Sequence, residues 1–116
     1  MKVLFVCLAN EGRSPYAERY FRERCREKGI DVEVTSAGLR AEDEFSRPVT
    51  RSLVESSDLI FVMEEYMKEE LIERFYADPR KICCLNVPNR SNSAELIRER
   101  LEFFVYLFEI LKEGLR

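Results

Sequence analysis

Residues 2–15, KVLFVCLANEGRSP, join a short apolar run to a polar loop and then to the start of a helix. The run Lys2–Cys7 has the length of a strand and is almost entirely apolar, which is typical of a central strand covered on both faces. Ser14 is the expected N-cap of the helix that follows, with Pro15 at the first helical position. This stretch predicts a strand, a tight loop and a helix in direct succession, as at the start of an α/β fold.

The rest of the chain continues the alternation of short strands and helices. The further expected strands are residues 31–36, 58–63 and 81–85, and the expected helices cover 14–29, 48–55, 67–75 and 97–111. The order βαβαβαβα predicts a three-layer α/β/α sandwich with a four-stranded parallel sheet, formed as one domain over residues 1–116. Ligands of such sheets bind beyond the carboxyl ends of the strands, so Asp31, Asp58 and Asp78, which precede strands, are expected at the opposite edge.

Composition excludes several classes of function. The 116 residues carry a formal net charge of −3, so we expect no nucleic-acid partner. No apolar run approaches the roughly 20 residues that span a bilayer and no leader pattern is present, so we expect a cytoplasmic protein without a membrane partner. The chain has no histidine, which excludes His-activated nucleophiles and imidazole zinc sites. We therefore expect no metal and no cofactor, and reduced thiols at the four cysteines.

The loop from Cys7 to Arg13, called the phosphate loop below, has the chemistry of an oxyanion site. Five residues between Cys7 and Arg13 suffice to wrap backbone N–H groups around a tetrahedral phosphate at a helix N-terminus. The same field favours a thiolate at Cys7, which makes this sulfur a nucleophile near neutral pH. The planar guanidinium of Arg13 can hold two phosphoryl oxygens at once.

Three segments in order, FVCLANEGRSPYAE, TSAG and DLIFVME, resemble the low-molecular-weight protein tyrosine phosphatase family and its small bacterial and archaeal relatives. The resemblance covers most of the chain and is strongest over residues 2–38. It implies the fold known as phosphotyrosine protein phosphatase I-like. It also implies a metal-free reaction in which Cys7 attacks a phosphomonoester and water then hydrolyses the cysteinyl-phosphate.

The resemblance also implies roles for single residues. Asn10 would shape the loop through hydrogen bonds, Ser14 would support the Cys7 thiolate, and Ser36 of TSAG would brace the loop. Together with the loop chemistry, this predicts three catalytic residues, Cys7, Arg13 and Ser14. It predicts six substrate-binding residues, namely Leu8, Ala9, Asn10, Glu11, Gly12 and Ser36. The expected partner is a phosphorylated protein or a small phosphomonoester, and the expected assembly is a monomer or weak homodimer.

The chain departs from the family in its general acid. Family phosphatases carry an Asp-Pro in the loop after the fourth strand, but here that loop, residues 86–93, has no carboxyl group. The Asp78-Pro79 pair precedes the strand, so we reject it as the acid. Three interpretations stay open: another carboxyl from Glu11, Glu64 or the Glu42–Glu44 cluster serves, only activated substrates are cleaved, or the chain binds a phosphorylated partner without turnover.

Glu11 is the unusual residue of the phosphate loop, because a carboxylate repels phosphate unless it is protonated or paired. Its position resembles one that helps select substrate in the family. We expect Glu11 either to donate a proton or to meet a cationic feature of the substrate.

The other cysteines raise a further alternative. Arsenate reductases that share this fold use extra cysteines in a disulfide cascade. Cys83 and Cys84 are adjacent within an expected strand, and Cys25 falls on the apolar face of the first helix, so all three are expected to pack in the protein interior. The principal prediction is therefore a cysteine phosphatase, with a phosphate-binding regulatory module and an arsenate reductase-like enzyme as alternatives.

Overall fold

The computed structural model describes residues 1–114 as an alternation of strands and helices. The elements are β1 (Lys2–Cys7), α1 (Arg13–Glu27), β2 (Glu33–Gly38), α2 (Arg51–Ser56), β3 (Leu59–Val62), α3 (Glu65–Phe75), the 3₁₀ turn η1 (Pro79–Lys81), β4 (Ile82–Cys84) and α4 (Ser93–Gly114). Within these residues, no helix is both long and apolar enough to cross a membrane.

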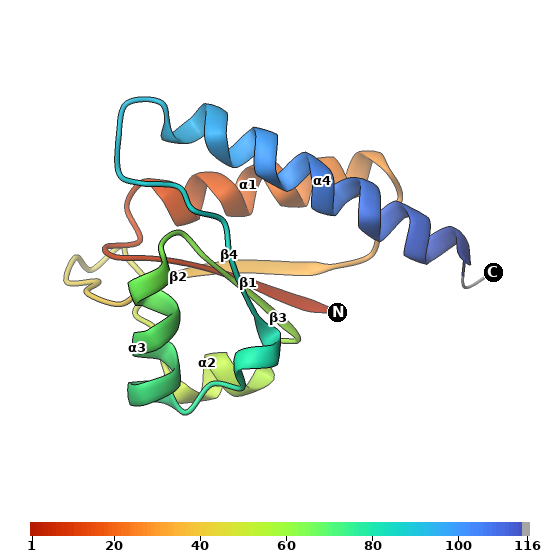
Figure 1. The fold of residues 1–116 in the computed structure, drawn as a ribbon. Helices are drawn as coiled ribbons and strands as arrows, with labels where there is room; N and C mark the ends of the chain where they lie inside the picture. The colour runs from red at the N-terminus through yellow and green to blue at the C-terminus, as the bar shows by residue number, and fades with distance from the viewer. Residues whose placement is uncertain (115–116) are drawn as a thin grey trace.

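The strands form one parallel sheet in the order β2-β1-β3-β4. Helices α1 and α4 cover one face of this sheet and α2 and α3 cover the other (Figure 1). The three-layer α/β/α sandwich with a four-stranded parallel sheet is confirmed. Strand β1 is an inner strand that pairs with both β2 and β3, and every residue from Val3 to Val6 is fully buried, as its apolar run predicts.

An aromatic cluster joins the sheet to α1 and α4. Phe5 of β1 and Phe61 of β3 are register partners, and their rings stack with centroids 5.1 Å apart. Phe21 of α1 meets Phe5 edge-to-face at 5.6 Å, and Phe104 of α4 meets Phe61 at 4.7 Å. Such pairs contribute about 0.5–1.5 kcal/mol beyond the apolar area they bury. The cluster therefore holds β1 and α1, which flank the phosphate loop, in a fixed relation.

Some element boundaries differ from the sequence prediction. Ser14 is not the N-cap: α1 begins at Arg13 after Gly12, and the Ser14 hydroxyl lies beside the Cys7 sulfur and the Asn10 amide. Strand β2 lies two residues later than expected, because its end pairs with the end of β1, Cys7 with Gly38. Helix α2 begins after Thr50, whose hydroxyl accepts from the Leu53 N–H.

Two aspartates that precede strands lie at the edge of the sheet opposite the phosphate loop. Asp58 precedes β3, and its carboxylate accepts the backbone N–H of Lys2 at the start of β1, at 2.7 Å. Asp78 precedes β4 and caps the 3₁₀ turn through the Arg80 N–H. Both carboxylates thus lie at the amino ends of the strands, away from the phosphate loop, and Asp78 is excluded as its proton donor.

Candidate active site

The phosphate loop lines a hollow at the carboxyl edge of the sheet. Cys7 ends β1 and Arg13 begins α1, so the residues between them reverse the chain within a few ångströms of the helix N-terminus. The hollow has a volume of about 310 Å³ and is lined by Cys7, Leu8, Ala9, Glu11, Gly12, Arg13 and Asn89. The structure therefore brings the expected nucleophile and the expected phosphate clamp to one cavity, called the Cys7 hollow below.

The sulfur of Cys7 is held by two polar groups at the base of this hollow. Its Sγ lies 2.9 Å from the Ser14 Oγ, and it accepts the backbone N–H of Asn10 at 3.2 Å. With a thiolate at Cys7, the Ser14 hydroxyl is the donor in the first of these contacts. Both contacts place a polar hydrogen-bonding group against the sulfur that is the expected nucleophile.

Asn10 organises the phosphate loop with both ends of its side chain. Its amide nitrogen donates to the Ser14 Oγ at 3.1 Å and to the Ser36 Oγ at 2.9 Å. Its Oδ1 accepts the backbone N–H of Arg47 at 2.8 Å. Asn10 has a φ of 59°, in the left-handed region where asparagine is one of the few tolerated residues. Its contacts agree with the loop-shaping role that the resemblance implies.

Glu18 extends this network in a way that the sequence interpretation missed. Ser36, nearly buried on β2, donates its hydroxyl to the Glu18 Oε1 at 2.6 Å while accepting from Asn10. Glu18 also pairs with Arg22, one turn further along α1. A signal was available, because Glu18 lies four residues after Ser14 and therefore on the same face of α1.

The glycine of TSAG permits a close approach between β2 and the phosphate loop. A Cβ added to Gly38 would lie 2.7 Å from the backbone carbon of Ala9 and 2.7 Å from the Asn10 nitrogen. Two backbone hydrogen bonds follow directly, from Leu39 N–H to the Cys7 carbonyl at 3.0 Å and from Arg40 N–H to the Leu8 carbonyl at 2.6 Å. Only glycine lets the strand brace the loop at this distance.

Arg13 is oriented by residues that follow strands β3 and β4. Its Nη1 donates to the Glu64 Oε2 and to the Val87 carbonyl, each at 2.7 Å. The guanidinium is nearly buried yet lines the Cys7 hollow, so its remaining N–H groups are available to an oxyanion. Glu64, one of the candidate acids in the sequence interpretation, is instead engaged in holding Arg13.

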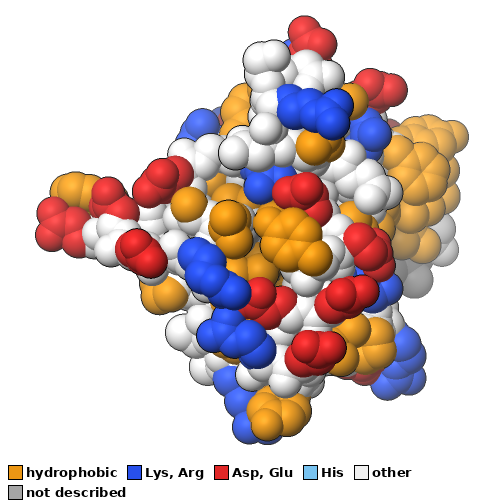
Figure 2. All heavy atoms as spheres, turned by 60° about the vertical axis from the view of Figure 1, so that its left-hand side comes forward, with side chains coloured by type: hydrophobic (Ala, Val, Ile, Leu, Met, Phe, Trp, Pro, Cys, Tyr) orange, Lys and Arg blue, Asp and Glu red, His pale blue; other side chains and the backbone are white. Residues whose placement is uncertain are grey.

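A second hollow lies behind the phosphate loop, next to the acidic loop. It has a volume of about 470 Å³ and is lined by Asn10, Glu11, Pro15, Glu18, Ser36, Asp43, Phe45, Ser46 and Arg47. The acidic residues Glu42–Glu44 lie in the loop between β2 and α2, and Figure 2 shows acidic side chains gathered on a projection at the left edge of the molecule. Among them only Asp43 lines this hollow, and none lines the Cys7 hollow.

The other cysteines have a different environment from Cys7. Burial raises the pKa of the Cys25 thiol to about 11, and burial also raises the pKa of the Cys83 and Cys84 thiols. All three disfavour the thiolate, and none lines the Cys7 hollow. The interior packing predicted for Cys25 is confirmed, while Cys83 and Cys84 are only partly buried in β4. Nothing in this arrangement provides a resolving thiol of the arsenate reductase kind.

Within residues 1–114, no three His, Cys, Asp or Glu side chains cluster closely enough to hold a metal ion.

Comparison with known proteins identifies related sequences and folds. Residues 2–45 match the family described as low molecular weight phosphotyrosine protein phosphatase. A protein-arginine-phosphatase of Bacillus subtilis is 30% identical over 95 residues, which cover 65% of this chain and 63% of that relative. The match therefore spans less than two thirds of the relative's length.

Two further similarities extend over nearly the whole chain. A probable low molecular weight protein-tyrosine-phosphatase of Ralstonia nicotianae, EpsP, is 26% identical over 97% of this chain and 89% of its own length. The crystal structure of YfkJ from Bacillus subtilis superposes with a TM-score of 0.79 at 25% identity, covering 97% of this chain and 96% of that one.

Proposed function

We propose that this chain belongs to the low molecular weight phosphotyrosine protein phosphatase family and that it is a cysteine-dependent phosphatase whose nucleophile is Cys7. The observation that carries the proposal is the Cys7 sulfur itself. It lies at the base of a hollow with the Ser14 hydroxyl at 2.9 Å and the Asn10 N–H at 3.2 Å, and Arg13 lines the same cavity.

The proposed reaction has two steps. The Cys7 thiolate attacks the phosphorus, the bond to the leaving oxygen breaks, and a cysteinyl-phosphate forms. Water then attacks this intermediate, which releases phosphate and restores the thiolate. Arg13, aligned by Glu64, and the backbone N–H groups of residues 8–13 offset the charge on the equatorial oxygens in both steps. The proposed reaction uses no metal, as the resemblance implies.

The substrate class follows from what the cavity can recognise. The phosphate loop contacts the phosphoryl group, so a phosphorylated protein side chain or a small phosphomonoester fits it equally well. The relatives are named for phosphoarginine and phosphotyrosine proteins, and both substrates share this group. Leu8, Ala9, Glu11 and Gly12 form the wall that the rest of the substrate would contact.

A paired set of cysteine variants tests the proposal. Purified wild type is expected to hydrolyse p-nitrophenyl phosphate, whereas Cys7→Ser is expected to lose this turnover. Cys84→Ser is the matched control, because Cys84 is partly exposed in β4 and lines no part of the Cys7 hollow. It should retain wild-type activity. If the wild type hydrolyses p-nitrophenyl phosphate no faster than Cys7→Ser does, the phosphatase proposal is wrong.

A phosphate-binding regulatory module is the second candidate, favoured by one observation. The loop after β4 contributes Asn89 to the Cys7 hollow, and an amide cannot donate a proton as a general acid. If the protein is such a module, titration calorimetry will show inorganic phosphate binding to the wild type without any Cys7-dependent hydrolysis. Arg13→Ala should abolish that binding.

A further inference from the structure

The Cys7 hollow contains one carboxyl side chain among its described lining residues, that of Glu11. From this placement we propose that Glu11 is the general acid and base of the reaction, in place of a residue from the loop after β4. The inference rests on the proposed phosphatase function. It assigns the proton-transfer step, which the cysteine and the arginine cannot perform.

The loop after β4 cannot supply the proton. Residues 86–92 read NVPNRSN and contain no carboxyl group, and the first acid beyond them is Glu95, inside α4. Asn89 reaches the Cys7 hollow from this loop, but its amide has no titratable proton. The loop after β4 therefore brings no acid to the Cys7 hollow.

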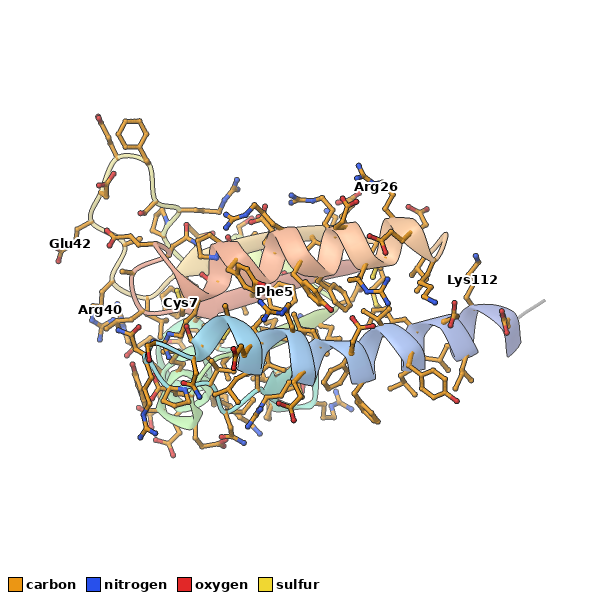
Figure 3. The ribbon with its side chains drawn as sticks, turned by 90° about the horizontal axis from the view of Figure 1, so that it is seen from above. Phe5, Cys7, Arg26, Arg40, Glu42 and Lys112 are labelled. Atoms are coloured by element: carbon orange, nitrogen blue, oxygen red, sulfur yellow. The ribbon has the colours of Figure 1, made fainter. Side chains whose placement is uncertain are left out.

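The acidic groups near the site are otherwise engaged or lie elsewhere. Glu64 is bound to Arg13 at 2.7 Å, and protonating it would release the phosphate clamp. In Figure 3 the acidic loop stands off the body of the protein, with Glu42 well away from Cys7. Asp43 accepts the Phe45 N–H and lines the other hollow.

Glu11 itself is free to act. Its side chain is exposed, and no ion pair or side-chain hydrogen bond of the described residues engages it. It lines both the Cys7 hollow and the hollow behind the loop, so it lies on the wall between them. A phosphoryl group bound in the Cys7 hollow would therefore share this cavity with the Glu11 carboxyl group.

The proposed proton transfers balance across both steps. As the Cys7 sulfur bonds to phosphorus and the phosphorus–oxygen bond breaks, the leaving oxygen takes the proton of the Glu11 carboxyl group. The carboxylate that results then accepts a proton from the attacking water, while the sulfur–phosphorus bond breaks and phosphate forms. The cycle ends with a thiolate at Cys7 and a protonated Glu11.

Leaving-group dependence tests this role. p-Nitrophenolate leaves without help from an acid, whereas phenolate needs a proton. Glu11→Gln is expected to lower kcat/KM for phenyl phosphate by about 10²- to 10⁴-fold and to change that for p-nitrophenyl phosphate far less. With phenyl phosphate, the wild-type kcat should fall at high pH, and the variant should lose this fall. Glu42→Gln, an exposed acid outside the Cys7 hollow, is the matched control and should behave as wild type.

The outcomes separate the two proposals. An equal loss on both substrates would overturn the general-acid role, because it would show that Glu11 acts in binding alone. Unchanged rates with both substrates would overturn it as well. In either case a wild-type turnover of p-nitrophenyl phosphate that Cys7→Ser abolishes would leave the phosphatase proposal standing. If wild type matches Cys7→Ser on p-nitrophenyl phosphate, the phosphatase function fails, and the role of Glu11 fails with it.

Discussion

The phosphate loop and the loop after β4 both follow a parallel strand at the same edge of the sheet, yet they are built very differently. In the phosphate loop, the Asn10 side chain bonds to Ser14, to Ser36 and to the backbone of Arg47. In the loop after β4, Val87 is buried and bonded to Met63 and Arg13, but residues 89–92 are exposed. Side-chain hydrogen bonds thus hold the phosphate loop in one shape, whereas the loop after β4 is exposed around Asn89 and forms what is called the open side of the Cys7 hollow below.

This difference concerns two parts of the proposed phosphoryl transfer. Fixed donors around the phosphoryl group need no reorganisation when charge develops, which is the usual origin of a large rate effect. A general acid, in contrast, affects only substrates whose leaving group needs a proton. The molecule should therefore tolerate changes in the loop after β4 and respond strongly to changes in the phosphate loop.

Of the changes that compare the two loops, replacement of Arg13, the expected phosphate clamp, should lower kcat/KM the most. Arg13→Lys keeps the charge but loses the planar fork, so kcat/KM for p-nitrophenyl phosphate should fall by about 10²- to 10³-fold. Arg90→Lys makes the same replacement at an exposed position of the loop after β4 and should leave the rate unchanged. Comparable losses in the two variants would remove the distinction between the two loops.

The next effect comes from the contact between β2 and the phosphate loop. Gly38→Ala places a methyl group against the Ala9 and Asn10 backbone, so the loop must shift, at a cost of about 1–3 kcal/mol in the free energy of unfolding. Gly114→Ala is the matched control, since a Cβ there has no neighbour within 4 Å. It should change the unfolding free energy by less than about 0.5 kcal/mol in urea titrations. Equal stabilities for the two variants would contradict the close approach.

A smaller, positive effect is expected from adding an acid to the open side. Asn89→Asp puts a carboxyl group into the lining of the Cys7 hollow, and it should raise the turnover of phenyl phosphate by about tenfold at most. In the Glu11→Gln background it should restore part of the lost rate. Asn92→Asp, beyond the hollow, should do neither. No gain from Asn89→Asp in either background would show that the open side does not reach the leaving group.

Local patterns explain why much of this could be predicted. Strand β1, the phosphate loop and α1 are consecutive, so the placement of Cys7 and Arg13 at one hollow followed from the order of residues alone. The parallel sheet followed from the alternation of strands and helices. These inferences used contacts between neighbours in the sequence, where apolar periodicity and helix geometry are decisive.

The misses involve contacts between distant segments. Sequence patterns could not show that β2 ends at Gly38, because that end is set by pairing with Cys7 across the sheet. Nor could they show that Glu64 aligns Arg13, at a separation of 51 residues. The prediction that Ser14 is the N-cap of α1 was wrong, because its hydroxyl contacts the Cys7 sulfur instead of capping the helix. Tertiary partners override local preference at the site itself.

The smallest effect is expected far from both loops, at a cluster that ties α4 to α1. Hydrogen bonds from Arg24 hold the pKa of Glu102 at about 2. A carboxyl with a lowered pKa stabilises the fold above its unfolded pKa, near 4.5, and loses this contribution as the pH falls towards 2. The side chain is 43% exposed, so Glu102→Gln should cost about 1 kcal/mol or less at pH 7. The deficit in the Tm of Glu102→Gln, measured by circular dichroism, should shrink as the pH falls from 5 to 2. Glu99→Gln is the matched control on the same helix and should show no such trend, because Glu99 forms no ion pair within residues 1–114. The activity of Glu102→Gln at neutral pH should equal that of the wild type, because the contrast between the two loops is confined to the Cys7 hollow. A loss of activity in this variant would mean that the contact between α1 and α4 also positions the phosphate loop.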